Sequence, residues 1–155
     1  MIGIMLLMDI LRPESIIVPL QAADRETAIS LLIGALELPG TLDDRNLLRE
    51  AVLAREKAGS TGIGRGVAIP HARTPRLGKP LLAAGRLAKP IEFAAADAKP
   101  VSLIFLLAVP EADPRSHLQV LAALSRLTAD AKILKSLNRA ASAREFLSLL
   151  AAVSL

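Results

Sequence analysis

A nearly continuous apolar run over residues 101–109 constrains the fold more than any other stretch of this chain. It reads Val-Ser-Leu-Ile-Phe-Leu-Leu-Ala-Val and is followed by Pro110. A strand with one face in water alternates apolar and polar side chains, whereas a strand covered on both faces is apolar throughout. The run therefore predicts a β-strand that is buried between two layers of other structure.

Shorter patterns predict further strands and the helices between them. Residues 15–20 and 81–88 are short apolar stretches typical of strands, and Lys89-Pro90 is expected to break the second. Helices are predicted where apolar residues recur at helical spacing behind a capping residue, and the predicted caps are Asp24, Asp43 or Asp44, Asp113 before Pro114, Asp130 and Ser142. Strands and helices alternate without a linker or repeat. We therefore expect a single α/β domain, a three-layer α/β/α sandwich around a mixed β-sheet.

The second of these helices is expected to bury one stripe of side chains, which comprises Leu47, Leu48, Ala51, Val52 and Ala54.

The amino-acid composition limits the classes of function that this chain can have. The 155 residues include no cysteine, which excludes disulfides, thiolate metal sites and a catalytic thiol, and is typical of a cytoplasmic protein. The net charge of +4 permits nucleic-acid binding. However, the basic residues are scattered and only three Phe offer aromatic surfaces for bases, so we expect no nucleic-acid partner.

The stretch from Gly59 to His71 is the main candidate for function. Four glycines fall within eight residues, and the apolar run Val67-Ala68-Ile69 then leads into Pro70 and His71. Glycine accepts positive φ, which allows tight turns and close backbone approaches. The pattern predicts a brief buried strand with His71 presented at its end, on a surface shaped by turns. Loops on a rigid scaffold commonly hold functional side chains.

This stretch resembles the phosphorylation-site signature of the EIIA domains of the bacterial phosphotransferase system, fructose/mannitol type, and the nitrogen-regulatory EIIA proteins are the nearest match. The signature reads Arg55-Glu-Lys-Ala-Gly-Ser-Thr-Gly-Ile-Gly and then Gly-Val-Ala-Ile-Pro-His71. Two later blocks extend it over nearly the whole chain, namely Pro90-Ile-Glu-Phe-…-Val109-Pro110 and His117-Leu118. The resemblance begins near Met8. It implies a domain over residues 8–155 preceded by an extension or loosely ordered arm at 1–7, with Met1, Met5 or Met8 as the start.

The resemblance also implies roles for particular residues. A phosphoryl carrier needs an exposed imidazole nitrogen, donors for the phosphoryl oxygens, and a bond that orients the ring. His71 would accept the phosphoryl group, assisted by His117 and Arg55. The loop residues would either donate bonds to the phosphoryl group or only shape the loop, and they are Ser60, Thr61, Gly62, Gly64 and Gly66. Taken without the resemblance, His71 could be a turn residue, His117 a helix-start residue and Arg55 a solvated cation.

Two residues depart from the family pattern. Arg65 stands where the family usually has a small polar residue such as Asn, which bears on partner preference. Ala72 stands where the family usually has Gly, and it predicts a negative φ directly after His71.

The function implied is that of a cytoplasmic phosphocarrier, which takes a phosphoryl group from an HPr-type protein and has a regulatory output. One alternative is a separate EIIA subunit that passes the group to the EIIB part of a sugar permease. Others are a non-catalytic protein-binding module in which His71 is only part of an interface and, more remotely, a hydrolase with His71 as base and Ser60 or Ser116 as nucleophile. No metal or organic cofactor is implied. The N-terminal apolar run is shorter than the roughly 20 residues that span a bilayer and lacks the features of a signal peptide, so we expect no membrane insertion.

Overall fold

The computed structural model describes residues 2–40 and 42–153, and its strands form one six-stranded mixed sheet. The strands are β1 (Leu11–Leu20), β2 (Gly62–Gly64), β3 (Val67–Ala68), β4 (His71–Thr74), β5 (Leu81–Ile91) and β6 (Val101–Pro110). Their order is β1-β5-β6-β3-β2, with β4 also paired to β6. β1 runs parallel to β5, and both β3 and β4 run parallel to β6, whereas β5 is antiparallel to β6 and β2 to β3.

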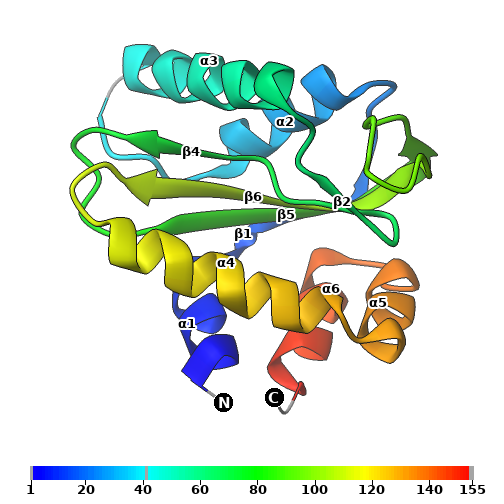
Figure 1. Ribbon diagram of the computed structural model, residues 1–155. Helices are drawn as coiled ribbons and strands as arrows, with labels where there is room; N and C mark the ends of the chain where they lie inside the picture. Colours follow the sequence, from blue (N-terminus) through cyan, green and yellow to red (C-terminus); the bar gives the residue numbers. More distant parts are fainter. Residues whose placement is uncertain (1, 41, 154–155) are drawn as a thin grey trace.

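Helices cover both faces of this sheet. They are α1 (Ile2–Ile10), α2 (Arg25–Ala35), α3 (Leu42–Ala58), α4 (Pro114–Thr128), α5 (Ala131–Asn138) and α6 (Ala143–Ala151). Figure 1 shows α2 and α3 on one side of the sheet and α1, α4, α5 and α6 on the other. The expected single α/β domain with three layers is therefore confirmed.

β6 is the buried strand that the apolar run predicts. Its side chains alternate between two cores, as a period of two requires. Leu103, Phe105 and Leu107 pack with the helices on the α4 side. Ile104, Leu106 and Ala108 pack on the side of α2 and α3. The apolar composition of this strand thus reflects burial on both faces.

Most predicted helix starts are confirmed, and one is wrong. Asp24, Asp113, Asp130 and Ser142 each accept a hydrogen bond from a backbone amide in the first turn of the helix that follows. The exception is α3, which begins at Leu42 and so places Asp43 and Asp44 inside its first turn. Carboxylates there still interact favourably with the helix dipole.

The buried face of α3 also differs from the expected stripe. Leu48 and Val52 are fully buried, but Leu47 is 51% exposed and Ala54 is exposed as well. The buried positions instead repeat every four residues and continue to Glu56, which is 4% exposed. The rotation of α3 about its axis is set by its packing on the sheet, which apolar spacing alone did not determine.

β5 continues through Lys89-Pro90 to Ile91, so the expected break there is wrong. Its regular pairing with β6 ends at Arg86 and resumes at Ile91, and its pairing with β1 ends at Leu87. Proline lacks the amide that a regular ladder requires, but the ladder is irregular at this point. The strand therefore accommodates Pro90 without losing a regular bond.

Residues 2–7 were expected as an extension or loosely ordered arm, and in the structure they are part of α1. Leu7 is 1% exposed and packs in the core on the α4 side. Residues 1, 154 and 155, which the expected boundaries include, lie outside the described residues. None of the helices described is long and apolar enough to cross a membrane.

Candidate functional site

His71 is held at the start of β4, beside the central strand. β3 and β4 follow one another along β6, and between them the Pro70 carbonyl accepts a bond from the Leu107 amide at 2.9 Å. Because successive side chains of a strand point to opposite faces, His71 and Arg73 share one face. Ala72 packs toward α2 and α3. His71 and Arg73 therefore face the α4 side. Ala72 also keeps a negative φ, as predicted.

A single short hydrogen bond orients the imidazole of His71. Its Nδ1 lies 2.8 Å from the Ile69 carbonyl oxygen. A carbonyl can only accept, so Nδ1 bears the proton and donates it. In the neutral ring this leaves the lone pair on Nε2, which is the nitrogen free to act as a nucleophile. The side chain is half-buried, held by its backbone bond and still reachable.

His117 lies one turn into α4, next to His71. Asp113 caps this helix by accepting from the Ser116 amide at 3.2 Å. This cap fixes where α4 begins, and His117 lies in its first turns. The centroids of the two imidazole rings are 5.3 Å apart, and the rings make an interplanar angle of 58°. His117 Nε2 is buried and has no hydrogen-bond partner among the described residues. Buried polar atoms are nearly always bonded, so this nitrogen is suited to a group brought by another molecule.

The electrostatics of the site favour an anion. Burial lowers the pKa of His117 below its ordinary 6.5, and the positive charges of His71 and Arg73 lower it further. His117 is therefore neutral near pH 7, with the cation Arg73 close enough to act on it. A dianion placed between the rings would meet favourable charge from Arg73 and, in the tautomer of His117 with its proton on Nε2, a hydrogen-bond donor.

Arg55 lies in the last turn of α3 and is bonded to the start of the glycine loop. It is exposed, and its guanidinium donates to the Gly59 carbonyl at 2.7 Å, just beyond the end of α3. No described hydrogen bond or ion pair joins Arg55 to either histidine. A cation at this end of a helix is favourable in its own right. Its assistance to His71 stays a prediction.

The hydroxyls of the glycine loop are bonded within the protein. The Ser60 hydroxyl donates to the Phe93 carbonyl at 2.5 Å and accepts from the Gly62 amide at 3.0 Å. The Thr61 hydroxyl donates to a carboxylate oxygen of Glu56, also at 2.5 Å. These bonds support the alternative in which the loop shapes the site. A direct role of its residues in binding a phosphoryl group stays a prediction.

The turn of this loop explains why Arg65 is an unusual residue there. Gly64, Arg65 and Gly66 have φ of +94°, +59° and +78°, so all three adopt left-handed backbone. Glycine and Asn tolerate that region best. Arg65 donates its amide to Asp97 at 3.0 Å, and its side chain reaches the Ala129 carbonyl at 2.6 Å. These bonds hold the turn against the C-terminal end of α4.

Arg73 and Glu56 were not among the site residues predicted from the sequence. Arg73 is the cation whose charge acts on His117, and its place two residues after His71 is the sequence signal for this. Glu56 is buried, and its position four residues after Val52 is the sequence signal for that burial.

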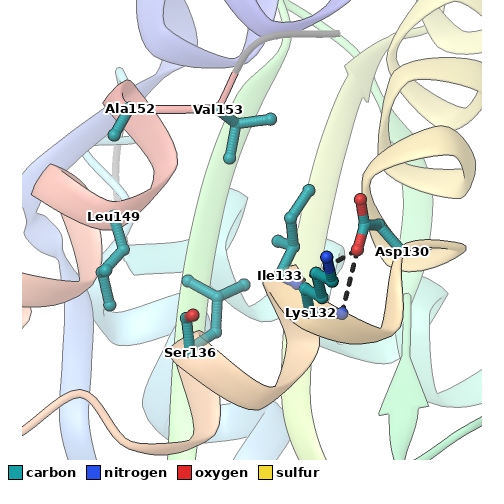
Figure 2. Close-up of a pocket in the computed structure, with 8 residues that line it drawn as sticks. Asp130, Lys132, Ile133, Ser136, Leu149, Ala152 and Val153 are labelled. Carbon is teal, nitrogen blue, oxygen red and sulfur yellow. Dashed lines mark hydrogen bonds between the residues drawn. The ribbon is translucent and has the colours of Figure 1, made fainter.

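The cavity in Figure 2 is separate from this site. It has a volume of about 330 Å³, lies between α5 and α6, and is lined by Asp130, Lys132, Ile133, Ser136, Leu137, Leu149, Ala152 and Val153. Neither histidine lines it. By contrast, Leu118, which follows His117, is 69% exposed on the surface of α4.

Comparison with known proteins identifies relatives over nearly the whole chain. Residues 9–153 match the family model described as "Phosphoenolpyruvate-dependent sugar phosphotransferase system, EIIA 2". A nitrogen regulatory protein of Bradyrhizobium diazoefficiens is 38% identical over 144 residues, which are 92% of this chain and 93% of that protein. The fructose-specific EIIABC component of Bacillus subtilis is 34% identical over 86% of this chain, but the match spans only 21% of that longer protein.

A solved structure agrees with these matches. The nitrogen regulatory protein IIA-Ntr of Neisseria meningitidis superimposes with a TM-score of 0.86 at 36% identity, covering 94% of this chain and 99% of that one. The six-stranded mixed sheet flanked by helices is therefore shared with it.

Proposed function

Because this chain belongs to the EIIA 2 family of the phosphoenolpyruvate-dependent sugar phosphotransferase system, we propose that it is a phosphocarrier whose acceptor is Nε2 of His71. One observation supports this assignment above the others. His71 donates its Nδ1 proton to the Ile69 carbonyl, and the ring of His117 lies next to it with a buried Nε2 that has no partner in the part of the chain that the structure describes.

In the proposed reaction the lone pair of His71 Nε2 attacks the phosphorus of a phosphohistidine on an HPr-type protein. A new N–P bond forms as the donor's N–P bond breaks, and the donor imidazole leaves with the electron pair. Such transfers depend mainly on in-line positioning and electrostatic stabilisation. The Ile69 carbonyl stabilises the positive charge that develops on the ring of His71. His117 donates from Nε2 to a phosphoryl oxygen, and Arg73 supplies charge.

Arg55 enters this proposal as a second source of charge. Its guanidinium donates through one nitrogen to the Gly59 carbonyl, which leaves other N–H groups for a phosphoryl oxygen. The charge of Arg73 already acts on His117 in the unphosphorylated protein. The proposal therefore gives Arg73 the larger electrostatic effect.

For the output of the carrier we propose regulation in the cytoplasm, by a partner protein that distinguishes the phosphorylated from the unphosphorylated form. The similarity to a nitrogen regulatory protein over 93% of that protein's length supports this reading. The alternative is transfer to the EIIB part of a sugar permease, and the similarity to a fructose-specific component supports it. We also retain residues 8–155 as the extent of the family domain.

The direct test is to incubate the protein with phosphoenolpyruvate, Enzyme I and an HPr-type protein and to measure its intact mass. We expect one phosphoryl group per chain, lost on acid treatment and never gained by His71→Ala. A phosphoryl group that survives acid, or that appears equally on the variant, would contradict the assignment.

The two outputs are separated by following where the group goes. A pull-down with phosphorylated and unphosphorylated protein should recover a partner that prefers one form. Rapid loss of the group to a permease EIIB, without any partner that discriminates, would instead establish the transport alternative.

A further inference from the structure

Glu56 places a carboxylate in the dry interface between α3 and the sheet. It is 4% exposed and lies on the same face of α3 as Leu48 and Val52. Burying a carboxylate is unfavourable unless hydrogen bonds or an opposite charge compensate for the lost water. The partners of Glu56 therefore show what the buried charge stabilises.

Thr61 of the glycine loop supplies most of the hydrogen bonds to Glu56. Thr61 donates its amide to Oε1 of Glu56 at 2.9 Å and its hydroxyl to Oε2 at 2.5 Å. Ser60 makes only a weaker contact with Oε1, at 3.4 Å, because its proton is directed to Phe93. Arg25 lies 3.9 Å from Oε1 and supplies opposite charge. Both oxygens of the carboxylate are thus used to hold Thr61.

Thr61 is connected in turn to His71 by two backbone carbonyls. The Thr61 carbonyl accepts from the Ile69 amide at 3.0 Å, and the Ile69 carbonyl accepts from His71 Nδ1 at 2.8 Å. Thr61 and Ile69 are 4% and 3% exposed, so water has little access to replace these bonds. A continuous series of bonds therefore runs from Glu56 through Thr61 and Ile69 to the imidazole.

We propose that Glu56 is a positioning residue for His71. By fixing Thr61 it fixes the Ile69 carbonyl, and that carbonyl decides which nitrogen of His71 bears the proton and where the ring points. The inference deepens the proposed phosphocarrier function and depends on it for its effect on rate.

Loss of the Glu56 carboxylate should change the orientation and the tautomer of the His71 imidazole. The amide and hydroxyl of Thr61 would be left buried without partners, which the loop can relieve only by moving. The Ile69 carbonyl would then hold Nδ1–H less firmly, and His71 would populate the tautomer with the proton on Nε2. In that tautomer Nε2 has no lone pair with which to attack phosphorus.

The test compares Glu56→Ala and Glu56→Gln with wild type by two measurements. The first is the nitrogen chemical shifts of the His71 imidazole in the unphosphorylated protein, which report the tautomer. The second is the rate of phosphoryl acceptance from an HPr-type protein. Ser15→Ala is the matched control, because Ser15 is 5% exposed and donates to the Leu82 carbonyl at 2.9 Å in β5. The substitution removes the hydroxyl bonds to Leu82 and Arg12, and strand β6 lies between β5 and His71.

We expect Glu56→Ala to move the His71 shifts toward a tautomer mixture and to slow acceptance by about tenfold to hundredfold, the range that misplacement of a reacting group can cost. Glu56→Gln should recover most of the rate, since its amide can accept from the Thr61 amide and donate to the Thr61 hydroxyl. Ser15→Ala should lower stability without moving the His71 shifts.

Unchanged His71 shifts in a folded Glu56→Ala protein would overturn the inference, as would equal shifts in Ser15→Ala. Should Glu56→Ala not fold, Thr61→Val decides instead. It keeps the amide bond to Glu56 and loses only the hydroxyl, so a smaller shift in the same direction is expected and no shift would overturn the inference. The shifts are read without phosphorylation, so a wild type that accepts no phosphoryl group would refute the proposed function while leaving this result to stand.

Discussion

Near β3 and β4, the buried polar groups on the two sides of the sheet differ in whether they are hydrogen-bonded. On the side of α3, the carboxylate of Glu56 accepts from both the amide and the hydroxyl of Thr61. On the side of α4, His117 Nε2 is buried and unpartnered within the described chain. A buried network whose hydrogen bonds are all formed makes the local structure rigid, whereas a buried nitrogen without a partner can bond to a group from another molecule. The comparison indicates that the first side positions His71 and the second side meets the phosphoryl group.

The largest expected effect on function comes from His71→Ala, which removes the residue between the two sides. We expect no phosphoryl acceptance at all, because the one other histidine of the sequence, His117, has its Nε2 buried and is proposed to donate a hydrogen bond, not to attack phosphorus. Stability should fall by only about 0.5–1.5 kcal/mol, the usual value of one hydrogen bond. Intact mass after incubation with the donor proteins, together with thermal unfolding, checks both parts. Acceptance at the wild-type level would show that another residue is the acceptor.

His117→Ala tests the unsatisfied side. It removes one donor to a charged group, a loss of about 1.5–3 kcal/mol, or roughly tenfold to hundredfold in rate if the bond forms mainly in the transition state. Stability should change little, because Nε2 has no partner to lose in the described structure. Rapid-quench experiments measure the rates of phosphoryl transfer to and from the variant. Wild-type kinetics would mean that His117 is only a residue at the start of α4.

A smaller effect should separate the two arginines. Arg73→Gln removes a charge that lowers the pKa of His117, so that pKa should rise and acceptance should slow by a few fold, about the effect of one nearby charge. Arg55→Gln should leave the pKa of His117 unchanged, because Arg55 donates to Gly59 instead. Titration of both variants by NMR makes the comparison. An equal response to the two substitutions would remove the distinction between the arginines.

The smallest effect is a pH dependence of stability. Since the pKa of His117 is lowered in the folded state, the unfolded chain binds the proton more readily. Stability from this residue is present above its unfolded pKa of about 6.5 and is lost as the pH falls below that value. His117→Asn should therefore lose less stability than wild type between neutral and mildly acidic pH. Urea unfolding across that range measures the difference, and parallel curves would contradict the lowered pKa.

Local sequence signals predicted much of the fold. The apolar run of β6 and the capping residues are local patterns, so a buried strand and the helix starts could be predicted before any tertiary contact was known. The family resemblance indicated that His71 and His117 belong to one site. That these two imidazoles lie 5.3 Å apart depends on the angle of α4 against β6, which no local pattern contains.

The residues that the sequence did not predict depend on tertiary packing. Glu56 in a helix end looks solvated until the rotation of α3 is known, and Leu47 looks buried for the same reason. Pro90 looks like a strand breaker until the irregular pairing of β5 is seen. In each case long-range packing overrode a local preference.

Titration of His117 by NMR before and after phosphorylation shows whether the α4 side of the sheet receives the phosphoryl group. In the free protein the pKa of His117 should lie below 6.5. With a dianion of about −1.5 to −2 charge on His71, the charged form of His117 is favoured and its pKa should rise. A pKa that stays the same after the phosphoryl group is added would show that His117 does not contact it, and would contradict the account.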